Sequence, residues 1–113
     1  MRYEELSPIS RDEATEAFRR GEDTYSLCQS LLRVALHEED GRWALDRITS
    51  FLFDPNPEVR SVAVASIGYV VRIHRAIDVS AALPKLYALQ ADAHVAARVR
   101  ETLADIRQFT RAA

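Results

Sequence analysis

Histidines are the first residues to consider for catalysis or metal binding, and the chain has three of them. His37, His74 and His94 lie far apart. None stands four residues from another, the spacing that places two imidazoles on one helical face as metal ligands. Three scattered glycines cannot build a phosphate-binding loop, and no Gly-x-Ser-x-Gly nucleophile motif is present. The sequence therefore indicates no enzyme activity, no cofactor and no metal site.

Cysteine and carboxylate chemistry is equally sparse. Cys28 is the single cysteine and falls on the apolar face of an expected helix, so a small core residue with an inert thiol is favoured over a nucleophile. Glu38, Glu39 and Asp40 form the densest acidic run, but they lack the spaced oxygens of a calcium loop. We interpret this run as a solvated helix end in which Asp40 caps the next helix. We also expect His37 to lie near that helix end, where an imidazolium interacts favourably with the helix dipole.

Length and composition predict a single domain over residues 1–113. The chain is 48% apolar and 28% charged, with only three Gly and four Pro. That composition excludes a disordered chain, which could not bury enough apolar surface to offset the entropy lost on ordering. The first residues do not combine a basic end with an apolar stretch, and the longest nearly apolar run, 62–71, is about half a membrane span. We expect a cytoplasmic protein with no membrane partner.

Apolar residues recur every three or four positions nearly from end to end, which predicts helices rather than strands. The breaks carry helix-start signals, because Ser10 and Glu13 have the form of a capping box and Asn56 precedes Pro57. The stretch 57–74 is apolar on two sides and is expected at the centre, between neighbouring helices. The expected helices span about 10–20, 23–38, 42–53, 57–74, 78–90 and 94–111.

One segment carries a family signature. The run from Asp54 through Val59 and Arg60, followed by Ala63 and Ile67, resembles the turn and second helix of a HEAT repeat. The resemblance implies an all-α fold, a short HEAT-like α-solenoid of about six antiparallel helices stacked as three right-handed pairs.

A second, weaker copy of the signature follows. Leu83 to Leu86 resembles the first helix of such a repeat, and Asp92 and Arg100 stand for the turn Asp and the helical Arg. In the family this Arg can pair with the Asp of a neighbouring turn. The resemblance therefore predicts that Arg60 and Arg100 tie adjacent units together.

Charge is distributed unevenly along the chain. Residues 1–54 hold seven Arg and twelve Asp or Glu, a net charge of −5, whereas residues 55–113 hold eight Lys or Arg and five acids, a net charge of +3. In a stack of helix pairs these halves become an acidic end and a basic end. An acidic end accelerates encounter with a basic protein partner. Ordinary surface charge, split partly by chance, explains the same asymmetry equally well.

Extended surface without catalytic machinery favours binding of one dedicated protein partner. In size, architecture and acidity the chain resembles the small, stand-alone helical-repeat immunity proteins of bacterial toxin systems, including contact-dependent growth inhibition. This resemblance implies a cytoplasmic inhibitor that binds a cognate toxin domain, often a cationic nuclease, and occludes its active site. The residues expected to contact the partner are Glu38, Glu39, Asp40, Trp43, Arg47 and Arg72.

Two other functions stay open at this point. A HEAT-like adaptor or regulatory protein would present the same kind of surface. Nucleic-acid binding through the arginines of the second half is a weaker alternative, because single-stranded bases need interleaved aromatics and that half has only Tyr69, Tyr87 and Phe109. Trp43 also has two possible roles, either as a half-exposed anchor for a partner or as a side chain that closes the core between the second and third helices.

Overall fold

The structure is a computed structural model that describes residues 6–20 and 23–110. These residues form six α-helices and no strand, as the apolar periodicity predicts. No helix among them is both long enough and apolar enough to cross a lipid bilayer. The helices are α1 (Arg11–Arg20), α2 (Thr24–His37), α3 (Gly41–Thr49), α4 (Pro57–His74), α5 (Leu83–Leu89) and α6 (Ala96–Phe109).

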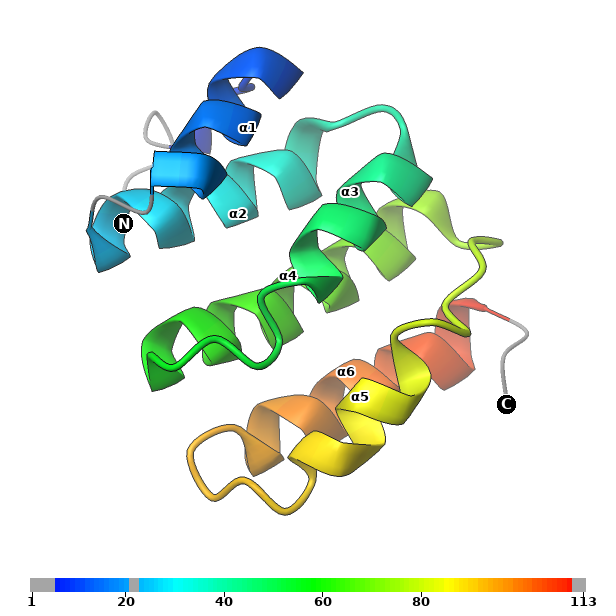
Figure 1. The fold of residues 1–113 in the computed structure, drawn as a ribbon. Coiled ribbons are helices and arrows are strands. Elements are labelled where there is room, and N and C mark those ends of the chain that lie inside the picture. The colour runs from blue at the N-terminus through cyan, green and yellow to red at the C-terminus, as the bar shows by residue number, and fades with distance from the viewer. Residues whose placement is uncertain (1–5, 21–22, 111–113) are drawn as a thin grey trace.

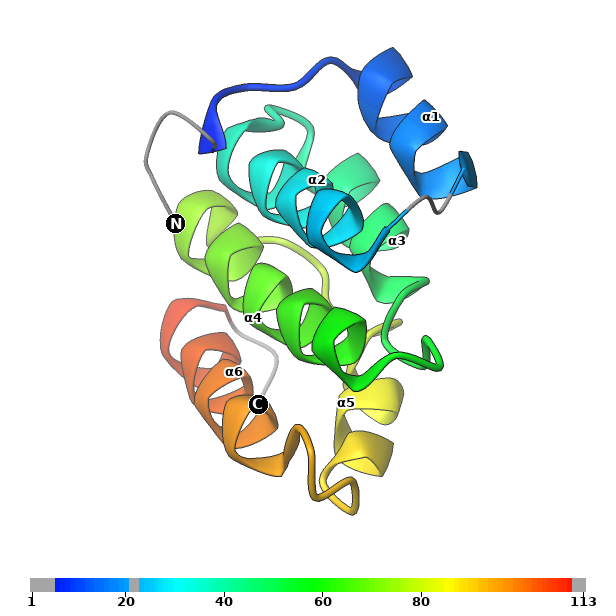
Figure 2. The same cartoon turned by 90° about the vertical axis from the view of Figure 1, so that its left-hand side faces the viewer.

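The helices lie in two layers (Figures 1 and 2). One layer contains α2, α4 and α6 side by side, and the other contains α1, α3 and α5. The central helix is α4, which packs against α2 and α6 within its own layer and against α3 in the other. In addition, α1 packs on α2, and α5 packs on α6. The prediction that 57–74 lies between neighbouring helices is confirmed.

Composition explains why α4 occupies the centre. Val64 and Val71, which give the helix its second apolar side, are completely buried, as are Ile67 and Val70. Burial of one such side chain stabilises the fold by about 1.5–3 kcal/mol. At Gly68 a Cβ atom would lie only 3.1 Å from Asp105 Oδ2, so the missing side chain allows α6 to approach closely.

The predicted helix starts are confirmed by hydrogen bonds. Ser10 and Glu13 form the capping box, with the Glu13 N–H donating to Ser10 Oγ at 3.1 Å and the Ser10 N–H to Glu13 Oε1 at 3.4 Å. Asp23 accepts the Ser26 N–H at the start of α2. Asn56 accepts the Glu58 N–H at the start of α4, where Pro57 is the first helical residue.

The end of the third helix and the start of the fifth differ from the prediction. The third helix ends at Thr49 rather than near 53, because the chain continues in tighter turns closed by bonds such as Phe51 N–H to the Ile48 carbonyl. The fifth begins at Leu83 rather than at Asp78 or Ser80. Asp78 instead accepts both the N–H and the hydroxyl of Ser80, which forms a local turn that competes with a helix.

The last helix is also shorter than predicted. Asp92 accepts the His94 N–H in another local turn, and α6 begins at Ala96. It ends at Phe109, and the predicted end at residue 111 lies outside the described residues.

Arg60 ties α4 to the segment between α5 and α6, as predicted. Its Nε donates to Asp92 Oδ2 at 2.9 Å, and its Nη1 donates to the carbonyls of Asp54 and Pro55 at 2.9 and 3.1 Å. The corresponding prediction for Arg100 is wrong. Arg100 is exposed, and no acidic or carbonyl partner holds it within 6–20 and 23–110. The physical reason is that Arg100 lies on α6, after which the described residues contain no further turn Asp.

Candidate functional site

The acidic run after α2 is held by an arginine from α1. Arg11 donates from Nε to Glu38 Oε1 at 2.9 Å, and from Nη2 to Glu38 Oε2 at 3.3 Å and Asp40 Oδ2 at 3.2 Å. The Arg11 guanidinium holds the pKa of Glu38 below its usual value, and the Glu38 side chain is only 12% exposed. Glu38 also accepts the Asp40 N–H at 2.7 Å. Two of the three carboxylates in the run are therefore engaged within the fold.

Asp40 is the N-cap of α3, as predicted. Its Oδ1 accepts the N–H groups of Trp43 and Arg42, each at 3.1 Å. The bond from Trp43, together with Arg11 and the Arg42 N–H, lowers the pKa of Asp40. A carboxylate at this position satisfies N–H groups that no helical carbonyl reaches, so Asp40 fixes the start of α3.

Trp43 lies between two guanidinium groups. The Cζ atoms of Arg11 and Arg47 lie 5.0 and 5.5 Å from its ring centre, within the range of cation–π attraction. The ring is half-buried and packs against the hydrophobic core. Of the two roles considered for Trp43, the structure shows the core contact, and the contact with a partner stays a prediction.

The predicted contact residues around α3 differ in how far their side chains are exposed to solvent. Glu39 and Arg47 are exposed, and Glu39 has no hydrogen-bond or ion-pair partner in the described part of the chain. These side chains form one surface around the start of α3. We call it the α3 cluster and define it by Arg11, Glu38, Glu39, Asp40, Trp43 and Arg47.

Arg72, the sixth predicted residue, lies outside the α3 cluster. From α4 it donates to Asp105 Oδ2 of α6, at 2.9 Å from Nη2 and 3.2 Å from Nε. Its Cζ lies 5.7 Å from the ring centre of Tyr69. All three residues border a groove between α4 and α6 that Arg98 also lines. The structure therefore places Arg72 in a second, separate surface.

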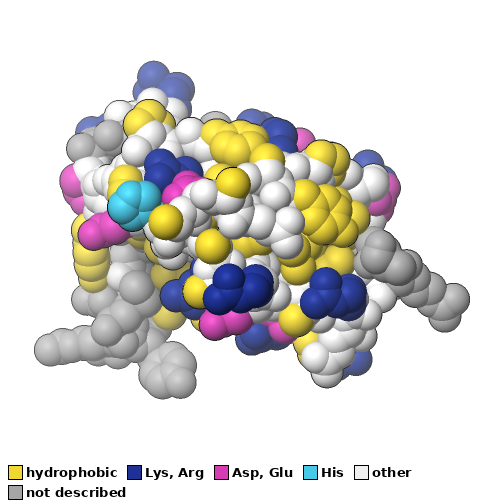
Figure 3. Space-filling model, turned by 90° about the horizontal axis from the view of Figure 1, so that it is seen from below, with side chains coloured by type: hydrophobic (Ala, Val, Ile, Leu, Met, Phe, Trp, Pro, Cys, Tyr) yellow, Lys and Arg dark blue, Asp and Glu magenta, His cyan; other side chains and the backbone are white. Residues whose placement is uncertain are grey.

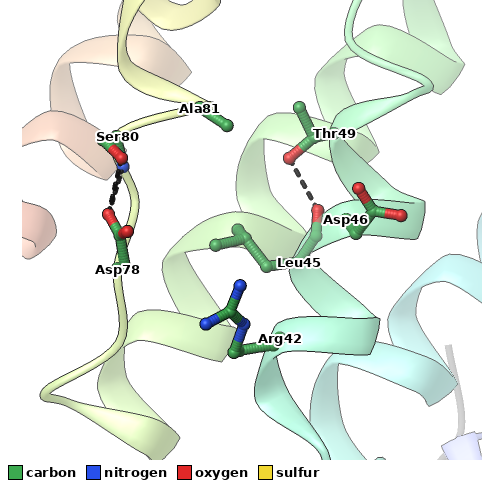
Figure 4. Close-up of a pocket in the computed structure, with 7 residues that line it drawn as sticks. All are labelled: Arg42, Leu45, Asp46, Thr49, Asp78, Ser80 and Ala81. Carbon is green, nitrogen blue, oxygen red and sulfur yellow. Dashed lines mark hydrogen bonds between the residues drawn. The ribbon is translucent and has the colours of Figure 1, made fainter.

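A cleft lies between α3 and the segment that joins α4 to α5 (Figure 4). Arg42 extends from α3 toward this segment, where Asp78 accepts the hydroxyl and the N–H of Ser80 at 2.7 and 2.9 Å. The Ser80 bonds, followed by the charge of Arg42, lower the pKa of Asp78. The cleft has a volume of about 140 Å³, and its lining contains no histidine or cysteine. Sequence reasoning missed it because Arg42 and Asp78 are far apart along the chain.

A larger groove lies between α2 and α4. It has a volume of about 500 Å³ and is lined by residues of these two helices alone. Gln29 is only 8% exposed, and neither its Oε1 nor its Nε2 has a hydrogen-bond partner among the described residues. Sequence reasoning missed Gln29, because its burial depends on the packing of α4 against α2. We call this feature the α2–α4 groove, and its lining residues are Thr24, Tyr25, Cys28, Gln29, Glu58, Ser61 and Val62.

Cys28 is half-buried in this groove and packs against the core. Burial raises the pKa of its thiol, and the negative charges of Glu58 and Asp54 raise it further. A thiol with a raised pKa is a weak nucleophile at neutral pH. The environment of Cys28 therefore agrees with the inert role that the sequence predicts.

The histidines near helix ends make structural contacts. His37 Nε2 is in hydrogen-bond contact with the Leu6 carbonyl, which ties the segment before α1 to the end of α2. His74 packs on the start of α3, where a Cβ atom added to Gly41 would lie 2.7 Å from His74 Cγ. Over the described ranges, no three His, Cys, Asp or Glu side chains gather in a way that could hold a metal ion.

The end of the molecule formed by α5 and α6 carries mixed charge. Figure 3 shows basic side chains interspersed with acidic and hydrophobic ones on the face seen from below, rather than one continuous basic surface. Arg98 lies 3.9 Å from Glu101, and Arg75 lies over the ring of Phe109. On this face the net positive charge of the second half of the chain does not gather into a phosphate-binding track.

Comparison with solved structures connects this fold to a known complex. The chain is similar to a chain in the crystal structure of a CDI complex from Cupriavidus taiwanensis LMG 19424, with 32% sequence identity and a TM-score of 0.82. The match covers 96% of this chain and 97% of that chain. The chain belongs to the same family as this component of a CDI complex. No protein-family model and no curated protein sequence matches it.

Proposed function

We propose that the protein is an immunity protein of a contact-dependent growth inhibition system, which binds and blocks a cognate toxin domain. The observation that carries the proposal is the match to a chain of a CDI complex over nearly the full length of both chains. Because the two chains share a fold over nearly their full lengths, the match supports the proposal that this chain also acts by binding a protein partner. The proposal includes a cytoplasmic location and a non-enzymatic mode of action, in which the partner is blocked by occupancy.

We also propose that the chain is a single HEAT-like domain, a short solenoid of three antiparallel helix pairs. The two-layer arrangement supports this, with α4 at the centre of its layer. The bond between Arg60 and Asp92 supports it as well, because it joins one expected unit to the next. A solenoid of this kind presents a continuous surface to one partner.

The proposed contact residues are the members of the α3 cluster other than Arg11, together with Arg72. Within the cluster, Glu39, Trp43 and Arg47 have surface free to meet a partner, whereas Glu38 and Asp40 hold the loop that presents them. Charged residues at the rim of an interface chiefly set the association rate and the choice of partner. The acidic groups would suit a basic toxin domain of the nuclease type, whose phosphate-binding site they would occupy.

Co-expression tests the proposed function. The protein is produced together with the toxin domain of its contact-dependent growth inhibition system, and growth is compared with cells that carry the toxin domain alone. We expect full protection and a stable complex in size-exclusion chromatography. Titration of the purified toxin domain should abolish its activity at one equivalent, since a blocking protein acts stoichiometrically and an enzyme would act at far lower amounts.

Two outcomes would contradict the proposal. A protein that neither protects cells nor forms a complex is not the immunity protein of that toxin. A protein that forms a complex but leaves the toxin active is an adaptor or regulatory protein.

A further inference from the structure

We propose that the groove between α1 and the end of α3 binds an acidic side chain, Asp or Glu, of the partner protein. The inference rests on the proposed function, because it names the chemistry of one contact with the toxin domain. The groove has a volume of about 310 Å³. We call it the α1–α3 groove, and its lining residues are Thr15, Phe18, Arg19, Arg47, Ser50 and Phe51.

The α1–α3 groove is basic, although it lies in the acidic half of the chain. Among the described residues, its lining contains two arginines and no acid. Arg19 is paired with Glu16 of its own helix, with Nη2 2.6 Å from Oε1. Asp46, the residue before Arg47, lines the cleft of Figure 4 instead. Arg47 therefore supplies the uncompensated positive charge of the groove.

The Arg47 guanidinium is held in place and still has its donors available. Its Cζ lies 5.5 Å from the ring centre of Trp43, an attraction that needs no hydrogen bond. The side chain has no hydrogen-bond or ion-pair partner within 6–20 and 23–110. The forked N–H donors of a guanidinium match the two oxygens of a carboxylate. Because the contact with Trp43 already restricts Arg47, less conformational entropy is lost when a partner binds it.

Apolar surface beside Arg47 strengthens such a pair. Phe18 and Phe51 are half-buried, and their ring centres lie 5.2 Å apart. Apolar groups lower the local dielectric, so a guanidinium and a carboxylate attract each other more strongly there than in open water. Thr15 is exposed, and its hydroxyl, which has no partner in the described part of the chain, offers a further donor.

The surrounding charge favours a single acidic side chain over a nucleic acid. Residues 1–54 carry a net charge of −5. An adjoining groove shares Phe18 and Phe51 with the α1–α3 groove and is lined by Asp23 and Asp54. A phosphate backbone is a dense row of negative charges, which these acids would repel. One carboxylate can meet Arg47 without approaching the other acids.

The α1–α3 groove is continuous with the α3 cluster, because Arg47 belongs to both. The acids of the cluster attract basic domains in general, since charge chiefly sets the association rate. The groove adds a requirement of the opposite sign. A basic domain that lacks an acid at this place would cover Arg47 without pairing it, which costs affinity. The groove thus selects the cognate toxin domain among basic ones.

Thr15→Glu tests the sign of the charge that the groove binds. The new carboxylate stands four residues before Arg19 on α1, a favourable spacing, so the melting temperature should not fall. We expect the affinity for the toxin domain to fall about tenfold or more at low salt, and less at high salt, because like charges repel. Thr15→Gln matches the size without the charge and should bind within about twofold of the wild type. Isothermal titration calorimetry at two salt concentrations measures both variants.

A charge exchange identifies the acidic side chain of the partner. Arg47→Glu should weaken binding by about tenfold or more, whereas Arg100→Glu, at an exposed arginine of α6, should not weaken it. Each Asp and Glu of the toxin domain is then replaced singly by Lys. One replacement should weaken binding to the wild type and restore much of the binding to Arg47→Glu, since only that pair regains opposite charges.

The outcomes separate failure of this inference from failure of the proposed function. If the wild-type protein forms no complex with the toxin domain, the proposed function is wrong and the inference falls with it. If the wild type binds and Thr15→Glu binds equally well, the groove lies outside the interface. Tighter binding by Thr15→Glu means that a basic group enters the groove. In both cases the inference is wrong and the proposed function stands.

Three further results would overturn the inference alone. Equal weakening by Thr15→Gln would mean that the groove does not respond to charge. Failure of every Lys replacement in the toxin domain to restore binding to Arg47→Glu would mean that no carboxylate meets Arg47. Binding of an oligonucleotide by the free protein, lost in Thr15→Glu, would assign the groove to phosphate.

Discussion

Arg11 and Glu38 form an ion pair across 27 residues of sequence, with Arg11 Nε 2.9 Å from Glu38 Oε1. The pair fastens the start of α1 to the end of α2, and Arg11 extends the contact to Asp40. The acidic run that the sequence presents as free surface charge is therefore largely part of the internal support of the fold. Glu39 is the member of the run that stays exposed and without a partner among the described residues.

Stability should fall on acidification, and Arg11 should be part of the cause. The folded protein holds the pKa values of Glu38 and Asp40 below their usual values. Such groups contribute stability above the unfolded-state pKa of about 4, and this contribution is lost as the pH falls through the lower folded-state pKa. We expect the free energy of unfolding to decrease below about pH 5, and to decrease less steeply in Arg11→Ala. Urea unfolding between pH 3 and pH 7 measures both slopes, and identical slopes would contradict this role of Arg11.

Arg60→Ala should destabilise the protein by about 2 kcal/mol, because it strands the Asp92 carboxylate and two carbonyls in a largely buried setting. Arg100→Ala is the matched control, since Arg100 is exposed and unpaired among the described residues. We expect it to change stability by less than about 0.5 kcal/mol. Chemical denaturation of both variants checks the difference. If both variants lose the same free energy of unfolding, the contact of Arg60 with Asp92 does not stabilise the fold.

Gly41→Ala should destabilise the protein by about 1–3 kcal/mol, the usual cost of overpacking. The added Cβ would lie 2.7 Å from His74 Cγ, an atom too close to its own backbone to move aside easily. Thermal melting of Gly41→Ala, His74→Ala and the double variant tests this reason. The double variant should recover part of the loss, because the clash disappears with the imidazole. A strictly additive double variant would rule out this contact as the cause.

Charge reversal should separate the supporting acids from the contacting acid. Glu39→Lys should leave the melting temperature unchanged and slow association with the toxin domain by about tenfold at low salt, with a smaller effect at high salt. Glu38→Lys should lower the melting temperature, because it places a positive charge against Arg11. Stopped-flow association kinetics and thermal melting measure the two effects. Unaltered association of Glu39→Lys at every salt concentration would remove Glu39 from the interface.

The sequence predicted correctly those features that depend on interactions between residues close together in the chain. The capping box at Ser10 and the caps at Asp40 and Asn56 form as predicted, because each donor and acceptor lies within three residues of the other. The predicted helix boundaries are wrong where a local turn competes with the helix. At Asp78 the side chain folds back onto Ser80, and the fifth helix begins later than its apolar pattern suggested.

The candidate site depended more heavily on contacts between distant residues. The sequence predicted Arg72 as a contact residue together with five residues near α3, but in the fold Arg72 lies apart from them and binds Asp105, 33 residues further along the chain. Gln29 passed unnoticed because its missing partners and its groove exist only when α4 lies against α2. Neither relationship has a short-range signature.

The sequence by itself determined the helical class, the helix starts and the central position of α4, because periodicity and capping act over a few residues. Only the tertiary structure decided which charges stay free, which are consumed in ion pairs, and where the buried amide of Gln29 lies. The physical reason is that exposure and pairing depend on side chains brought from other helices, roughly thirty positions away.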